Sequence, residues 1–254
     1  MFKIDLTESF PLLSRAPIVE AIIGVTARAV STWEESAITE QFKRCLPEYP
    51  NVQSHREIRR EFKLAPGAKS EQAVQDMGWL GLRCESEDKL HIAQFNRDGF
   101  TFSRLKPYQV WEQFYQEGLR LWGLYNEIAQ PSEIQRIGLR FINRIEFSQD
   151  RVDLDDFLQN PPKTPLGMDV PFEGFLHHNT LEVPGYPYSI NVIQTVQPSQ
   201  GADDSWGVIL DIDVFTTKPI VNQDLIGQHL AEMRWLKNKA FFGSITSKTL
   251  EMIK

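Results

Sequence analysis

Three arginines, Arg136, Arg140 and Arg144, recur at every fourth residue of a segment whose alternation is typical of a strand. Side chains alternate between the two faces of a strand, so this spacing places all three guanidinium groups on one face, ~13 Å apart in succession. A row of guanidinium groups suits the phosphates or carboxylates of a partner. The alternative interpretation is an exposed strand face whose arginines pair with acidic neighbours. The opposite face is apolar and consists of Ile137, Leu139, Phe141, Ile145 and Phe147.

Asn143 belongs to the same segment, but the alternation places it on the apolar face. A buried amide must find hydrogen-bond partners. Asn143 therefore either ties down an irregularity of the strand or faces an internal cavity, and we favour the structural role.

A pair of carboxylates forms the second candidate site. Asp211 and Asp213 flank Ile212, so both point to one face of a strand, ~7 Å apart. This geometry suits a divalent cation or a general acid/base pair. The alternatives are an ordinary solvated strand face or ion pairs with Arg140 and Arg144 on a neighbouring strand.

The adjacent histidines His177 and His178 face opposite ways on a strand, so the two cannot ligate one ion together without a bend. One of them could complete a metal site with the two aspartates, and we take His178 as that candidate. No spacing typical of a metal motif supports this site.

Several well-known catalytic signatures are missing from the sequence. It contains no GxxxxGK[ST], GxGxxG, GxSxG or HExxH. A phosphate-binding P-loop, the usual dinucleotide turn, the lipase-type nucleophile and the common zinc-protease helix therefore have no support. We expect no cofactor.

The chain has 254 residues, and its composition is that of a globular protein. Its net charge of −7 argues against a general nucleic-acid binder. Acidic residues interrupt the start of the chain before a signal peptide could form, and no apolar run approaches the ~20 residues that span a bilayer. The two cysteines, Cys45 and Cys84, have no metal-binding spacing. We expect a cytoplasmic protein that does not enter a membrane.

The order of predicted elements repeats along the chain. A strand over residues 18–26 is followed by a short helix over 33–46, several strands and a long amphipathic helix that opens at Pro107. A second series begins with a strand at 134–147 and ends with a long helix that opens at Asn222.

From this repetition we expect an α+β fold of two tandem pseudo-repeats. Each would be an antiparallel sheet with a short helix after its first strand and a long C-terminal helix packed on the sheet. The halves would be residues 1–130 and 131–254, which could also form one continuous domain.

Several segments together resemble one protein family over nearly the whole chain. They include Pro17-Ile18-Val19-Glu20-Ala21, the passage from Phe100 to Trp122, Ile137-Gly138-Leu139-Arg140-Phe141-Ile142-Asn143-Arg144-Ile145, Leu210-Asp211-Ile212-Asp213-Val214 and Phe242-Gly243-Ser244-Ile245-Thr246. The sequence is similar to a sporadically distributed, uncharacterised family of bacterial and archaeal proteins of about this length. The resemblance implies no activity, cofactor or catalytic residue. The patchy distribution implies mobile gene neighbourhoods such as defence or toxin–antitoxin islands.

The sequence favours a non-catalytic binding protein that recognises a protein partner or a second copy of itself. The docking surface would comprise Arg136, Arg140 and Arg144, with Asn143 as a further candidate. The alternative is a metal-dependent enzyme acting on phosphate esters, with Asp211 and Asp213 holding the metal and Arg140 or Arg144 the phosphate. A further alternative is a small-ligand carrier with a cavity between helix and sheet.

Overall fold

The structure is a computed structural model of the chain. It describes residues 2–63, 71–147, 153–168, 170, 172–198 and 206–254, and for residues 58–63, 71–75 and 198 it describes the backbone only.

All strands of the described chain belong to one antiparallel sheet, whose nine strands lie in the order β2-β3-β4-β5-β1-β6-β9-β8-β7. The strands are β1 (Ile18–Thr26), β2 (Asn51–Lys63), β3 (Glu71–Glu85), β4 (His91–Asn96), β5 (Gly99–Leu105), β6 (Arg136–Phe147), β7 (Leu176–Glu182), β8 (Tyr188–Pro198) and β9 (Trp206–Thr216).

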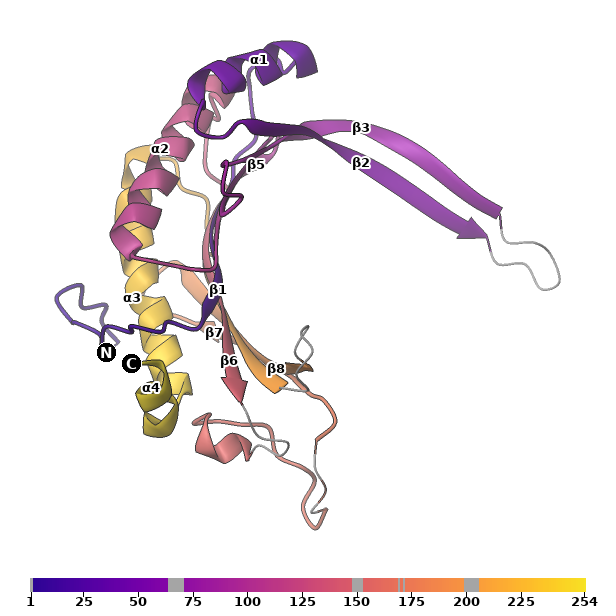
Figure 1. Ribbon diagram of the computed structural model, residues 1–254. Helices are drawn as coiled ribbons and strands as arrows, with labels where there is room; N and C mark the ends of the chain where they lie inside the picture. Colours follow the sequence, from indigo (N-terminus) through magenta and orange to yellow (C-terminus); the bar gives the residue numbers. More distant parts are fainter. Residues whose placement is uncertain (1, 64–70, 148–152, 169, 171, 199–205) are drawn as a thin grey trace.

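The two long helices cover one face of this sheet and leave the other uncovered by helices (Figure 1). The helical elements are α1 (Glu35–Cys45), α2 (Trp111–Ala129), η1 (Leu154–Asp156), η2 (Gln223–Leu225), α3 (Ile226–Ser244) and α4 (Ser247–Ile253). Helix α2 packs over β5, whereas α3 packs over β6 and β9. The face of α2 that meets the sheet is the stripe predicted from helical spacing, with Phe114, Leu121 and Trp122 all buried.

The α+β class is correct, but the expected pair of tandem repeats, each with its own sheet, is wrong. Strand β1 pairs with β6 from Ile18 to Thr26, so strands from both halves of the chain form a single sheet. The physical reason is that an unpaired strand edge leaves a row of N–H and C=O groups without partners, and β1 and β6 satisfy these groups on each other. One hydrophobic core extends along the whole helix-covered face, from Phe95 through Phe102 and Phe141 to Leu210.

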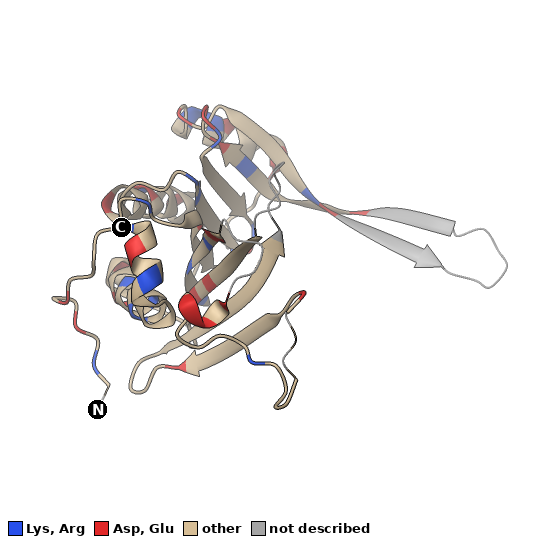
Figure 2. Ribbon diagram, turned by 60° about the horizontal axis from the view of Figure 1, so that its bottom comes forward, with Lys and Arg blue, Asp and Glu red and all other residues tan. Residues whose placement is uncertain are grey.

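Strands β2 and β3 extend beyond the sheet as a two-stranded arm (Figures 1 and 2). Strand β3 pairs with β4 only from Gly81 to Glu85, so the remaining part of the hairpin has no further strand beside it. The register of β2 on β3 shifts after His55 and again after Glu57, where the arm leaves the sheet. Basic and acidic residues are interspersed over the described elements (Figure 2).

Candidate interaction surface on the helix-free face of the sheet

The alternation of β6 places its side chains as the sequence predicts. Ile137, Leu139 and Phe141 are buried on the helix-covered face, and Arg136 and Arg140 stand on the helix-free face. In the register of β6 with β9, Arg140 lies opposite Asp213 and Ile142 lies opposite Asp211. The arginine row and the carboxylate pair therefore meet on adjacent strands of one face.

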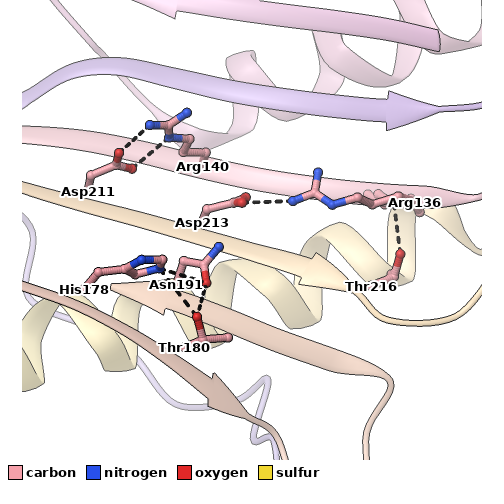
Figure 3. Close-up of polar contacts among 9 residues, drawn as sticks. Arg136, Arg140, His178, Thr180, Asn191, Asp211, Asp213 and Thr216 are labelled. Atoms are coloured by element: carbon pink, nitrogen blue, oxygen red, sulfur yellow. Dashed lines mark hydrogen bonds and ion pairs between the residues drawn. The ribbon is translucent and has the colours of Figure 1, made fainter. Parts of the chain in front are cut away.

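Two ion pairs join these strands (Figure 3). Arg140 donates from Nε to one oxygen of Asp211 at 2.8 Å and from Nη2 to the other at 2.5 Å. Arg136 donates from Nη2 to Asp213 at 2.9 Å. The aspartates thus pair with Arg140 and Arg136, and not with Arg140 and Arg144 as the sequence suggested.

The charged groups differ in exposure. The side chains of Asp211 and Asp213 are 9% and 19% exposed, whereas those of Arg140 and Arg136 are 44% and 40% exposed. Arg136 also lies over the Phe215 ring, with its guanidinium carbon 4.6 Å from the ring centre. The carboxylates form the floor of this surface, and the guanidinium groups form its accessible part.

The local electrostatics follow from this layering. Burial raises the pKa of the Asp213 carboxyl above its ordinary value, and the charges of Arg136 and Arg140 oppose this rise. The hydrogen bond to Asp211 raises the pKa of the Arg140 guanidinium. Burial thus disfavours the ionised form of Asp213, whereas the neighbouring arginines favour it.

His178 continues the polar surface across β8 (Figure 3). Its Nε2 lies 3.3 Å from the side-chain oxygen of Asn191, which also accepts a hydrogen bond from Thr180 at 2.8 Å. Asn191 lies opposite Asp213 in the register of β8 with β9. Within the described part of the chain, no cluster of three or more His, Cys, Asp or Glu side chains could hold a metal ion.

Arg144 and Asn143 do not join this surface directly. Arg144 has a 15% exposed side chain, 3.5 Å from Glu146, and its Nη2 donates to the carbonyl of Gln197 at 3.5 Å. Asn143 is buried on the helix-covered face and donates to the carbonyl of Leu210 at 2.9 Å. The structure thus brings together Arg136, Arg140, Asp211, Asp213 and His178, and it separates Asn143 from them.

Sequence reasoning missed Asn191, which belongs to this surface, and two residues that contact its members, Thr180 and Phe215. The alternation of β8 and β9 carried a signal for Asn191 and Phe215, because both share the parity of the residues that face away from the helices. The pairing of β7 with β8, which brings Thr180 to Asn191, is not visible in that alternation.

We define the helix-free charged surface as Arg136, Arg140, Asp211, Asp213, Asn191 and His178. Comparison of the chain with models of known protein families and with curated protein sequences finds no match. None of the described helices combines the length and the apolar character needed to cross a membrane.

Proposed function

We propose that this protein is a non-catalytic binding protein that docks an acidic segment of a partner protein on the helix-free charged surface. The observation that carries the proposal is the layering of charge, with largely buried carboxylates beneath half-exposed guanidinium groups. A partner approaching this face meets positive charge first, on a chain whose net charge is −7.

The ion pairs leave donors for such a partner. A guanidinium has five N–H donors. Within the described chain, Arg136 uses only Nη2 toward Asp213, and Arg140 uses Nε and Nη2 toward Asp211. The aspartates hold the guanidinium groups in fixed positions, which reduces the side-chain entropy lost on binding. Carboxylates of an acidic segment are suited to the remaining N–H groups.

Two other candidate functions have less support. A metal ion held by Asp211 and Asp213 would have to displace the arginines that already occupy both carboxylates. A carrier would need a cavity that Asn143 faces, but its amide is bound to backbone carbonyls. An open cleft of about 550 Å³ lies elsewhere, between the N-terminal arm near Phe10 and the junction of α3 with α4.

A cytoplasmic location and a mobile defence or toxin–antitoxin gene neighbourhood belong to this proposal. The location is supported by Cys45 and Cys84, which are both free thiols as a reducing compartment favours.

The experiment measures binding of a fluorescent Asp- and Glu-rich dodecapeptide at low ionic strength by anisotropy, beside the same peptide with Asn and Gln. We expect wild type and Asp211→Asn to bind the acidic peptide, because the variant leaves Arg140 in place and removes the competing carboxylate. The double variant R140Q/D211N keeps the shape of the pair but removes both charges, and we expect it to bind at least about tenfold more weakly.

The control is R83Q/E85Q, which neutralises a comparable ion pair on β3, with Arg83 Nη2 2.8 Å from Glu85. We expect this control to bind the acidic peptide as wild type does. Equal binding of the peptide with Asn and Gln would overturn the proposal, since the surface would then not select negative charge. Binding by R140Q/D211N equal to that of wild type would overturn it as well.

A further inference from the structure

Arg104 is a buried cation that forms no ion pair or side-chain hydrogen bond with any carboxylate among the described residues. It lies on β5, opposite His91 of β4 on one side and Ala21 of β1 on the other. The residue is 7% exposed, and its Nη1 atom is buried with no hydrogen-bond partner. No ion pair joins Arg104 to an Asp or Glu side chain among the described residues, in contrast to Arg140 with Asp211.

A guanidinium in this position cannot become neutral, because arginine stays protonated in proteins. Removing it from water without an acceptor is unfavourable by several kcal/mol. Buried polar atoms in folded proteins have partners, and an unpartnered one indicates a water, an ion or a ligand. An anion beside Arg104 would satisfy both the charge and the Nη1 donor.

The neighbours of Arg104 define what kind of anion fits. The His91 ring stacks on Phe102 with parallel planes and centres 6.1 Å apart, and its Nδ1 lies 3.9 Å from Asp88. Burial, and secondly the charge of Arg104, lowers the pKa of His91, so the imidazole is neutral at pH 7 and has one donor and one acceptor nitrogen.

Two carboxylates limit the charge of the ligand. Asp88 lies close enough to Arg104 for the guanidinium charge to contribute to lowering the pKa of the Asp88 carboxyl. The charges of Asp88 and of Glu117 on α2 both act to raise the pKa of His91. A phosphate dianion would therefore meet two negative groups and a single guanidinium. A monoanionic carboxylate matches both the single charge and the planar fork of arginine.

We propose that Arg104, assisted by His91, binds the carboxylate group of a small monoanionic ligand between α2 and strands β4 and β5. This site is on the helix-covered face, opposite the helix-free charged surface, and it does not depend on the function proposed for that surface.

The experiment titrates the full-length protein with sodium acetate, sodium benzoate and sodium phosphate, and with sodium chloride at equal ionic strength, and follows thermal unfolding. We expect a saturable rise of the melting temperature by about 2–5 °C with the carboxylates only. In Arg104→Met the rise should disappear, whereas the ligand-free melting temperature should stay equal or increase because a buried charge is gone. Arg104→Lys keeps the charge but not the fork, and it should bind the carboxylates more weakly.

Two controls make the result specific. Arg83→Met removes an arginine of the opposite face and should respond to the carboxylates as wild type does. By NMR, the pKa of His91 should rise when a carboxylate neutralises Arg104, whereas that of His229, whose Nδ1 is bound to Tyr188, should not change.

An equal rise with chloride, or a rise that persists in Arg104→Met, would overturn the site. A rise that depends on Arg104 but occurs with phosphate and not with either carboxylate would overturn the assignment of the ligand.

Discussion

Asn143 lies where the two central strands are irregular. The pairing of β1 with β6 shifts between Ile18, opposite Asn143, and Glu20, opposite Ile142. The Asn143 amide donates to the carbonyls of Leu210 on β9 and of Phe141 on its own strand, at 2.9 and 3.3 Å, and neither acceptor lies on β1. These hydrogen bonds join the amide to the backbone of β6 and β9, and the role of tying down the irregularity, which the sequence favoured over a cavity, stays a prediction.

Replacing Asn143 by Leu should lower the free energy of unfolding by roughly 1–3 kcal/mol, because the buried carbonyls lose their donor. Urea denaturation measures the change. Asn179→Leu, on the exposed edge strand β7, is the control and should stay within about 0.5 kcal/mol of wild type. A small effect at Asn143 would mean that the backbone holds the irregularity without the amide.

Lys237 presents a half-buried charge, with its Nζ 4.1 Å from the centre of the Phe141 ring. Burial, and secondly the charge of Arg234, lowers the pKa of the Lys237 ammonium to about 7. Between this value and the ordinary pKa of about 10.4, the unfolded chain binds more protons than the folded one. The stability contributed by this group therefore increases as the pH rises through that window.

Lys237→Met should accordingly be more stable than wild type at pH 6, and the difference in melting temperature should shrink toward pH 9.5. Calorimetry at several pH values measures it. Lys239→Met, which removes an exposed lysine paired with Glu8, should show no such trend. A difference that does not depend on pH would show that Lys237 stays charged or reaches solvent.

At the scale of residues, alternation in the sequence was sufficient to assign faces but not partners. It placed Arg136 and Arg140 on one face and Asn143 on the other, as the structure does. It did not reveal that Arg136 pairs with Asp213 or that Arg104 has no partner, because both depend on the register of strands far apart in the chain.

Helix α2 contains two glycines with opposite environments. A Cβ added at Gly118 would lie 2.5 Å from Cδ1 of Ile23, which is fully buried in the core, whereas nothing lies within 4 Å of a Cβ at Gly123. The close approach of α2 to β1 thus explains why a residue that disfavours helices stands in its apolar stripe.

Gly118→Ala should destabilise the protein on the order of 1 kcal/mol, because overpacking against Ile23 exceeds the gain in helix propensity. Gly123→Ala, which gains the same propensity without a clash, should stabilise it by about 0.5–1 kcal/mol. Denaturant titration of both variants measures the contrast. A stabilising Gly118→Ala would mean that Ile23 moves aside freely.

At the scale of elements, the sequence predicted the helices and strands that pack on the core. It underestimated the length of a strand that extends away from the core. The strand at 18–26 and the long helix after Pro107 were found from apolar periodicity. The strands between the two predicted helices were expected without the arm, but β3 begins at Glu71. The part of β3 that precedes Gly81 has no β4 beside it, so no apolar alternation marked that part of the strand.

The whole molecule is organised around the pairing of β1 with β6, which the sequence did not predict. Periodicity shows which face of a strand is buried, but it does not show which strand lies next to it. The repeated order of elements therefore suggested two sheets, where the structure has one. The same pairing extends the core across the boundary at residues 130 and 131.

A chain divided at this boundary should not form two folded halves. Residues 1–130 alone would expose the edge of β1 from Ile18 to Thr26, and residues 131–254 alone would expose the matching edge of β6. Each half would also lose packing, because Tyr108 and Phe114 of the first half contact Phe141 of the second. We expect each fragment to lack a cooperative thermal transition, and the mixed fragments to recover one.

The control for this experiment is the full-length chain cut by a protease at a site inserted after Gly167, beside the fully exposed Leu166. This cut lies between β6 and β7, outside both strands, and leaves the pairing of β6 with β9 in place, so the cut protein should keep the single transition of the intact chain. A cooperative transition in either isolated half would show that the half folds by itself. The single sheet would then be an association of two folding units, and the β1–β6 pairing would act as an interface between them.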